Sequence, residues 1–492
     1  MTLILALDQS TSSTKAVLFD EKGQVVDRAA RDHRQIYPQP GWVEHDAEEI
    51  WQNVRAVLAE IAQRQSGRWH EVAGLSIANQ RETFVAFDRR SGRPLHNAIV
   101  WQCRRGDAAC RELTRAGAEE VVRTRTGLKL DTYFTAPKLK ALMEQSPDVA
   151  ARLRSGDAVV GTMDAYLVHR LTGGRVLAAD STNASRTLLF DAKRLCWDGE
   201  LCGLFNVPKV ALPEVRASSE RFGESNADGA LPNLLPLCGV MGDSQASLFA
   251  LGCYRPGMVK ATFGSGTSVL MNIGSAFVPV TRGSVVALAW VHRGQPTYAL
   301  EGLINYSSAT VAWLKDQLGL IADVADTEPL ARAVPDSGGV YLVPAFAGLG
   351  APYWRSDARA ALVGLTAFTK KEHVVRAALE SIAYQVRDVL TMMGAEAGVT
   401  PEVIRADGGA TRNALLMEMV ADLTRLELAV ADVAEASAWG AALAGLLGLG
   451  EYGSLEELAA LPRPSLAYRP QRASQETERM YDGWLAAVHR VM

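Results

Sequence analysis

The first thirty residues place apolar side chains in short runs that polar turns separate. Candidate strands cover 3–7, 16–19 and 25–27, and the turn sequence DEKG lies between the last two. A further apolar run of strand length covers 72–80. Short apolar runs bounded by turn residues are typical of strands with a buried face. The pattern predicts a β-meander at the start of the chain and another strand close behind it.

Two longer segments repeat their apolar residues at helical spacing. The first follows Asp46, a candidate N-cap with Glu49 three residues later, and its apolar face begins with Ile50 and Val54. The second covers about 372–393. Strands that alternate with helices predict an α/β fold, in which ligands bind at the C-terminal ends of strands.

Composition narrows the class of protein. A chain of 492 residues exceeds one compact core, so we expect two large domains. A net charge of −4 disfavours nucleic acid or an anionic membrane as the main partner. The six cysteines lack CxxC or disulfide-framework spacing, no apolar run approaches a membrane span, and residues 1–7 are too short for a signal peptide. We therefore expect a soluble, cytoplasmic protein.

The segment ALDQSTSSTKAVLFD, 6–20, concentrates hydroxyl groups at one bend. Small residues expose backbone N–H groups, and their hydroxyls add donors, so the bend predicts a cradle for phosphate oxygens. Lys15 adds positive charge at the rim, and Asp8 stands where it can hold Mg²⁺ through water. The residues of this cradle are Ser10, Thr11, Ser12 and Ser13.

The standard nucleotide-binding motifs do not explain this site. No GxxxxGK[ST] occurs in the chain. A GxGxxG occurs at 448–453, but it follows the helical sequence ASAWGAALAGLL rather than a strand, which indicates a chance match.

The second half contains a similar bend. VKATFGSGTSVLMNIG, 259–274, again places a small-residue turn, Gly264, Ser265 and Gly266, between two apolar runs. Two α/β halves that each begin with such a hairpin would bring the hairpins face to face across a cleft, although two unrelated tight turns would give the same pattern. Later, 401–423 predicts a strand, a turn at Gly408 and Gly409, and a helix whose N-terminus suits a phosphorylated ligand.

Asp243 stands between an apolar run and a small-residue helix start. There a carboxylate can accept the proton of a hydroxyl that attacks a γ-phosphate, although an N-cap role is the common alternative. Candidates for the hydroxyl-bearing substrate lie earlier. Arg81 and Glu82 end a strand and can each take one hydroxyl of a polyol, while Trp101 and Tyr133 offer a flat face and a further hydroxyl.

Several longer motifs resemble one family. They include NQRET, QIYPQPGWVEHD, NAIVWQCRR, DSTNASRTLLF, YALEG, VPAFAGLGAPYW, LESIAYQVRDVL and DGGATRN. The chain is similar nearly end to end to the FGGY carbohydrate kinases, and most of all to those that phosphorylate glycerol. The resemblance implies two ribonuclease-H-like (actin/Hsp70-type) domains that flank an ATP cleft. We expect their boundaries at 1–251 and 252–492, and a homodimer as the assembly.

The resemblance also implies a role for each matching position. Asp243 matches the catalytic base, and it surrounds Mg²⁺ together with Asp8. The acceptor set comprises Arg81, Glu82, Trp101 and Tyr133. Phosphate and adenosine contacts comprise Ser12, Lys15, Gly264, Ser265, Gly266, Gly409 and Asn413.

The chain departs from the family pattern around both substrates. Ser244 stands where a Gln follows the base, and Ser268 stands where a Phe closes over glycerol. On the adenosine side, Ser308 and Ala312 replace a Gly and a Gln. The shorter acceptor side chains enlarge the pocket, which leaves a tetritol, pentitol or pentulose as the alternative acceptor.

Three other classes fit the residues less well. An actin/Hsp70-type nucleotide switch has no use for the polyol set, and a phosphatase of that superfamily needs a water-positioning acid instead. The eight His residues show no zinc-site spacing, which disfavours a zinc hydrolase.

Overall fold

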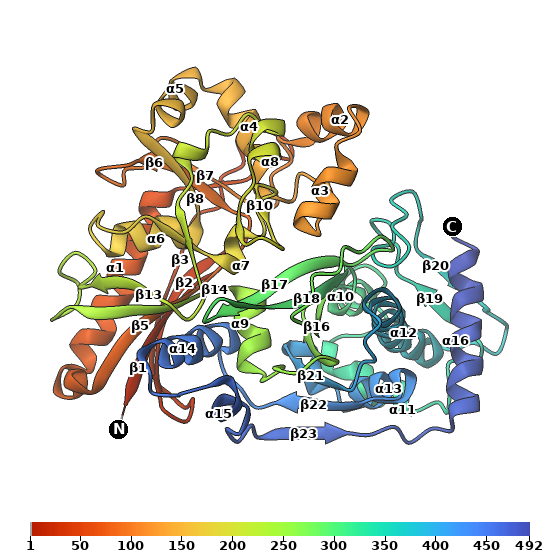
Figure 1. Ribbon diagram of the computed structural model, residues 1–492. Helices are drawn as coiled ribbons and strands as arrows, with labels where there is room; N and C mark the ends of the chain where they lie inside the picture. Colours follow the sequence, from red (N-terminus) through yellow and green to blue (C-terminus); the bar gives the residue numbers. More distant parts are fainter. Residues whose placement is uncertain (1) are drawn as a thin grey trace.

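Two large β-sheets organise the protein, and the computed structural model describes residues 2–492 (Figure 1). The first sheet has the strand order β13-β14-β5-β1-β2-β3. Strand β1 pairs antiparallel with β2 and parallel with β5, and β14 lies parallel beyond β5. Its strands are β1 (Leu3–Gln9), β2 (Ser13–Asp20), β3 (Val25–Asp32), β5 (Val72–Asn79), β13 (Arg221–Ser225) and β14 (Leu235–Gly242). The predicted meander and the strand behind it are confirmed.

The second sheet repeats this arrangement strand for strand, in the order β17-β18-β16-β15-β21-β22-β23. Strand β15 pairs antiparallel with β16 and parallel with β21, as β1 does with β2 and β5. Its strands are β15 (Met258–Phe263), β16 (Thr267–Gly274), β17 (Val285–His292), β18 (Gln295–Ile304), β21 (Val403–Asp407), β22 (Glu427–Ala431) and β23 (Ser465–Tyr468). The two hydroxyl-rich or glycine-rich bends are thus equivalent hairpins in two copies of one topology, with β17 added at one edge.

Helices cover both faces of the first sheet. Helix α1 (Ala47–Arg64) begins at the predicted cap, where the Asp46 carboxylate accepts two backbone N–H groups of the first turn. Leu3 and Leu5 belong to the core cluster with α1, whereas Ile4 and Ala6 belong to the cluster on the other face. Because β1 is buried on both faces, its apolar run is continuous rather than alternating.

Helix α14 (Ala436–Leu449) comes from the second half of the chain but packs on the first sheet. It contacts β1, β5, β14 and helix α9 (Asp243–Ala250), and Figure 1 shows it beside these strands. A Cβ on Gly440 would lie 1.8 Å from the Ala246 carbonyl oxygen, and one on Gly239 would lie 2.3 Å from that of Ala441. Glycine therefore permits backbone contact between α14 and the first sheet.

The GxGxxG segment lies at the end of α14. Gly450 closes the helix with a φ of 82°, and a Cβ on Gly448 would meet the Ser219 carbonyl oxygen at 2.0 Å. Helix α14 leads directly into it, whereas a dinucleotide-binding loop directly follows a strand. These glycines serve helix termination and packing.

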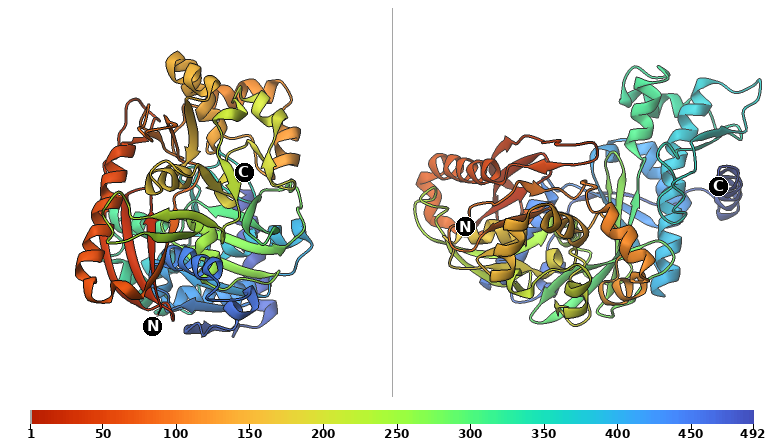
Figure 2. Two further views of the ribbon diagram at one scale, coloured as in Figure 1. Left: turned by 60° about the vertical axis from the view of Figure 1, so that its left-hand side comes forward. Right: turned by 90° about the horizontal axis from the view of Figure 1, so that it is seen from above.

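The remaining elements surround the two sheets. Figure 2 shows the red N-terminal segments and the cyan segments of the second half on opposite sides of the molecule. In the first half they are β4 (Glu44–His45), β6 (Phe84–Asp88), β7 (Ala98–Ile99), β8 (Ala158–Thr162), β9 (Ala178–Asp180), β10 (Phe190–Asp191), β11 (Cys196–Trp197), β12 (Glu214–Arg216), α2 (Asp107–Arg115), α3 (Glu119–Thr126), α4 (Thr135–Gln145), α5 (Pro147–Ser155), α6 (Met163–Leu171), α7 (Ser181–Ala184) and α8 (Gly199–Leu204). In the second half they are β19 (Tyr341–Val343), β20 (Ala361–Val363), α10 (Ser308–Asp316), α11 (Thr327–Arg332), α12 (Lys371–Ala397), α13 (Ala414–Thr424), α15 (Leu455–Ala459) and α16 (Ser474–His489).

Helix α12 confirms the long helix predicted over 372–393. Within residues 2–492, no helix combines the length and the apolar composition that crossing a bilayer requires.

Candidate active site

The first hairpin, between β1 and β2, is stabilised by its own hydroxyl groups. The Ser10 backbone N–H donates to the Ser13 carbonyl at 2.9 Å, and the Ser13 N–H donates to the Ser10 Oγ at 3.1 Å. Ser12 is exposed at the tip. The Thr11 Oγ1 accepts the indole N–H of Trp101 at 3.0 Å. This bond brings a predicted acceptor residue against the predicted phosphate cradle.

Asp8 and Lys15 lie opposite each other at the base of this hairpin. Burial, together with the Asp243 and Glu435 carboxylates and against the effect of Lys15, raises the pKa of Asp8 to about 7. The Lys15 Nζ lies 2.8 Å from a carboxylate oxygen of Glu435. Burial acts to lower the pKa of Lys15, but Glu435 outweighs it and the pKa is raised. The lysine is therefore held at the cleft by the residue that precedes α14.

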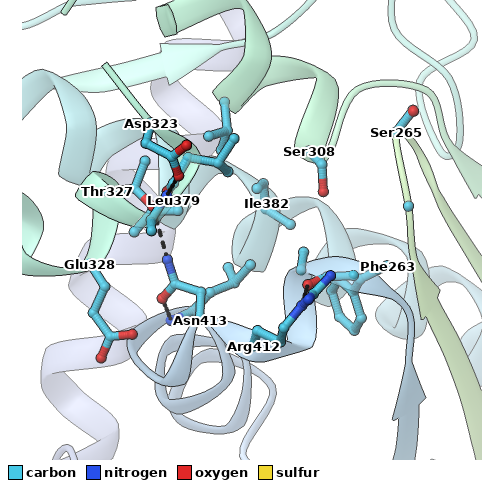
Figure 3. A pocket seen from close by; sticks show the side chains of 17 residues that line it. Phe263, Ser265, Ser308, Asp323, Thr327, Glu328, Leu379, Ile382, Arg412 and Asn413 are labelled. Atoms are coloured by element: carbon cyan, nitrogen blue, oxygen red, sulfur yellow. Dashed lines mark hydrogen bonds between the residues drawn. The ribbon is translucent and has the colours of Figure 1, made fainter. Parts of the chain in front are cut away.

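The second hairpin, between β15 and β16, opens on a cavity of about 670 Å³. Figure 3 shows Ser265 and Ser308 on one side of it and Asp323, Thr327 and Asn413 on the other. The full lining is Phe263, Gly264, Ser265, Ser308, Val311, Asp323, Val324, Ala325, Thr327, Glu328, Leu379, Ile382, Gly409, Ala410, Arg412, Asn413 and Leu416. Apolar walls with a few polar groups suit a flat, phosphorylated ligand.

The other predicted nucleotide residues shape this cavity or lie beside it. A Cβ on Gly266 would lie 2.4 Å from the Ile304 carbonyl oxygen. Gly408 has a φ of 99°, and a Cβ there would lie 2.4 Å from the Phe263 carbonyl oxygen. Ala312 lies on α10 outside the lining residues. Asn413 caps α13 and donates to the Thr327 hydroxyl at 3.1 Å, which explains its fixed orientation.

Asp243 is the first residue of α9, directly after β14. The N-cap position belongs to Gly242, so the alternative N-cap reading of Asp243 is wrong. The Asp243 side chain is 38% exposed, and its Oδ1 lies 3.2 Å from the Arg81 Nε. A Cβ on Gly242 would lie 2.8 Å from the Arg81 side chain, so glycine leaves room for this approach.

The predicted acceptor residues gather beside Asp243. Glu82 is buried and has a φ of 61°, a left-handed conformation that turns the chain after β5. The rings of Trp101 and Tyr133 pack with centroids 5.4 Å apart. Burial raises the pKa of Tyr133, so its hydroxyl stays protonated and can donate. Ser268 faces the same side of the second sheet as Glu301, and its buried Oγ has no hydrogen-bond partner in the described chain.

Two residues that received no role in the sequence analysis complete this cluster. Arg186 donates to Glu82 at 2.5 Å, and Glu301 on β18 accepts from Arg81 at 2.7 Å. Arg186 and Glu301 also approach each other at 2.8 Å. Both lie in motifs that carry the family resemblance, DSTNASRTLLF and YALEG, which was the available signal.

Across residues 2–492 there is no group of three or more His, Cys, Asp or Glu side chains placed to hold a metal ion. Asp243 lies close enough to Asp8 to raise the pKa of the Asp8 carboxyl. Such a pair suits a hard cation that completes its shell with water and phosphate oxygens.

Comparison with known proteins identifies the family. Residues 3–250 match the FGGY family of carbohydrate kinases, N-terminal domain, and residues 261–449 match its C-terminal domain. The chain belongs to the FGGY family of carbohydrate kinases. FGGY relatives include the glycerol kinase of Desulfitobacterium hafniense, 44% identical over 99% of both chains, and glycerol kinase 1 of Thermotoga maritima, 43% identical over 99% of both.

Solved FGGY structures share the fold over the whole chain. Plasmodium falciparum glycerol kinase with ADP superposes with a TM-score of 0.95 at 32% identity and covers 100% of this chain and 98% of that one. The xylulose kinase of Rhodospirillum rubrum gives 0.89 at 25% identity, with 99% and 98% covered. The expected architecture of two α/β domains is confirmed.

Proposed function

We propose that this carbohydrate kinase transfers the γ-phosphoryl group of ATP to a primary hydroxyl of glycerol or a similar small polyol. The observation that carries this proposal is the position of the Asp243 carboxylate among the candidate polyol-binding residues. The carboxylate is partly exposed, and its Oδ1 lies 3.2 Å from the Arg81 Nε. The glycerol kinase relatives at 43–44% identity support the same acceptor class.

Each acceptor residue has a defined task in this proposal. Arg81 donates to one hydroxyl and Glu82 accepts from the next, so that vicinal hydroxyls are held at two points. Trp101 packs against the C–H face, and Tyr133 donates a further hydrogen bond. Asp243 accepts the proton of the attacking hydroxyl, which keeps the nucleophile in line with the phosphoryl group.

The nucleotide is expected to lie between the two hairpins. Ser10–Ser13 and Gly264–Gly266 offer backbone N–H and hydroxyl donors to the phosphates, with Lys15 at the rim. The cavity beside Gly409 and Asn413 accommodates the adenosine. Asp8 and Asp243 would hold Mg²⁺ through water, and the bound ion supplies positive charge at the phosphate oxygens.

The division into domains at 1–251 and 252–492 is part of the proposal. The two separate sheets support it, and helix α14 crosses from the second part to pack on the first sheet. The homodimer and the cytoplasmic location stay predictions.

A larger acceptor is the second candidate. Ser268 presents a buried hydroxyl without a partner in the described chain, and Ser244 lies beside the base. Both can serve the additional hydroxyls of a tetritol, pentitol or pentulose. A nucleotide switch without an acceptor is disfavoured, because it leaves the buried polar cluster around Arg81 without a task.

A coupled assay of ADP release tests the proposal. The acceptors are glycerol, dihydroxyacetone, erythritol, threitol, ribitol and xylulose, each with ATP and Mg²⁺. We expect saturable ADP release with glycerol or a close homologue. ADP release that no acceptor stimulates would contradict the kinase proposal, and a strong preference for a five-carbon acceptor would replace glycerol as its substrate.

A further inference from the structure

Five side chains, four of them buried and the fifth, Asp243, partly exposed, form an unbroken series of alternating charge across the acceptor site. In order they are Glu82, Arg186, Glu301, Arg81 and Asp243. Successive partners lie 2.5, 2.8, 2.7 and 3.2 Å apart. The two ends and Arg81 carry the tasks proposed above for the acceptor. Arg186 and Glu301 lie between them and touch both.

Glu301 enters this series from the second sheet. It lies on β18, whereas Arg81 follows β5 of the first sheet and Arg186 follows α7. Its side chain is 1% exposed and that of Arg186 is also 1% exposed. Burial acts to raise the pKa of Glu301, but Arg186 and Arg81 outweigh it and lower the pKa to about 2. The carboxylate is therefore a permanent anion between two arginines from the other half of the chain.

The contacts leave part of this network unsatisfied. Arg186 Nη1 and Glu301 Oε2 approach each other, yet neither forms an aligned hydrogen bond in the described chain. Buried polar groups are normally hydrogen-bonded, so each exception calls for an explanation. Charge attraction to each other is therefore the contact that holds Arg186 Nη1 and Glu301 Oε2 in the described chain.

The Asp243 end of this network is also held through the backbone beside it. The Gly242 N–H donates to the Thr182 hydroxyl at 2.9 Å, and Thr182 lies on α7, which leads directly to Arg186. Gly242, the residue before the base, and Arg186 therefore share one support.

We propose that Glu301 is a positioning residue for the acceptor site, acting through Arg81 and Arg186 on Asp243 and Glu82. By holding Arg81 on one oxygen, Glu301 sets how closely the guanidinium approaches Asp243. By attracting Arg186 with the other, it sets the orientation of Glu82. This role rests on the proposed kinase function and adds a residue of the second sheet to its acceptor site.

The test compares Glu301→Gln with Glu301→Asp in the full-length protein. The Gln variant keeps the shape and removes the charge, so Arg81 and Arg186 lose their common anchor. Misplacement of reacting groups by about 1 Å costs on the order of 10²-fold in rate. We expect kcat/KM for the acceptor to fall by about this factor, with the KM for ATP unchanged. Glu301→Asp keeps the charge and should recover part of the loss.

Glu380→Gln is the matched control. Glu380 pairs with Arg376 within α12 at 2.9 Å, and both side chains are as buried as those of Arg81 and Glu301. It lies outside the acceptor site, so its loss should lower the melting temperature without changing kcat or the acceptor KM. Melting curves of all variants, with and without ADP, show which of them are folded and bind nucleotide.

The outcomes separate the two proposals. If the wild-type protein phosphorylates no acceptor, the kinase proposal fails. If it is active and Glu301→Gln matches Glu380→Gln in kcat and acceptor KM, the positioning role is overturned. If Glu301→Gln does not fold, the Glu301→Asp variant decides between a structural and a positioning role. If the charge serves stability alone, Glu301→Asp restores stability and activity together. Restored stability with a persistent defect in acceptor KM supports positioning.

Discussion

The two hairpins at the centres of the two sheets share one strand topology but differ in the chemistry of their residues. The last ladder pairs are Gln9 with Thr14 in the first hairpin and Phe263 with Thr267 in the second. One step deeper, the first hairpin pairs Asp8 with Lys15. The equivalent pair in the second hairpin is Thr262 with Ser268.

The hairpins also differ in what holds them. Hydroxyl bonds between Ser10 and Ser13 and the ion pair of Lys15 with Glu435 hold the first. Backbone contact holds the second, where Gly266 and Gly408 leave no room for a side chain. The first hairpin supplies charged side chains, and the second lets the backbone approach a ligand closely. Substitutions beside the two hairpins should therefore affect different steps of the reaction.

The largest effect is expected at Asp243, which follows β14 of the first sheet. Asp243→Asn removes the proposed proton acceptor while leaving the shape of the site, and loss of a general base costs about 10²–10⁴ in rate. Steady-state kcat on the best acceptor measures it, with nucleotide affinity as the internal control. Turnover close to that of the wild type would remove Asp243 from this role.

Asp8 should make the nucleotide-free protein sensitive to pH. Its pKa is raised from 3.8 to about 7, so the folded protein keeps a proton that the unfolded chain releases above pH 4. The free energy of unfolding therefore falls as pH rises from about 4 to about 7, by at most about 4 kcal/mol. Asp8→Asn should abolish this part of the fall.

Urea unfolding of both proteins at several pH values, without nucleotide or metal, measures the difference. Burial also raises the pKa of Asp164 and Asp388, but both remain in each protein and their effects cancel in the comparison. Parallel pH profiles for the two proteins would contradict the assignment.

Beside the second hairpin, the substitutions Gly408→Ala and Gly409→Ala form a matched pair of neighbouring glycines. A Cβ at 408 requires a left-handed backbone and meets the Phe263 carbonyl at 2.4 Å, whereas one at 409 meets only the end of Arg412 at 3.8 Å. Gly408→Ala should cost about 1–3 kcal/mol of stability. Gly409→Ala should leave stability intact and weaken ADP binding, because Gly409 lines the cavity. Thermal unfolding and ADP titration check both, and equal stability losses would sink the distinction.

The smallest effect concerns the choice of acceptor. Ser268→Phe adds apolar surface beside the acceptor site, and a few tens of Å² are worth about 1 kcal/mol, or several-fold in affinity. The ratio of kcat/KM for glycerol to that for erythritol or ribitol should rise. A uniform loss on all acceptors, or a strong preference of the native protein for glycerol, would contradict an enlarged pocket.

Sequence patterns predicted the fold well wherever the determining contacts are local. The Asp46 cap, the apolar run of β1 and the helix over 372–393 depend on neighbours in sequence, and the structure has all three. The repeated bend predicted two similar hairpins, and the structure has them as equivalent elements of the two sheets. Local spacing also distinguished the GxGxxG at 448–453 from a nucleotide-binding loop.

The candidate site was harder to predict because its electrostatics join distant segments. Glu301 meets Arg81 across 220 positions, and Lys15 meets Glu435 across 420. No periodicity or spacing marks such partners. A single Glu within an apolar strand sequence does not fit a buried strand unless the arginines that neutralise its charge are known.

The position of α14 has a consequence for how the protein is made. The first sheet and α9 are complete by residue 250, yet the helix that covers one of their faces ends at Leu449. At a synthesis rate of about 5–20 residues per second, the ribosome takes roughly 10–40 s to close this gap. During that interval Ile4, Ala6 and the backbone around Gly239 lack their cover. During synthesis the first sheet therefore exposes the apolar face that α14 later covers, and a chaperone could bind this face.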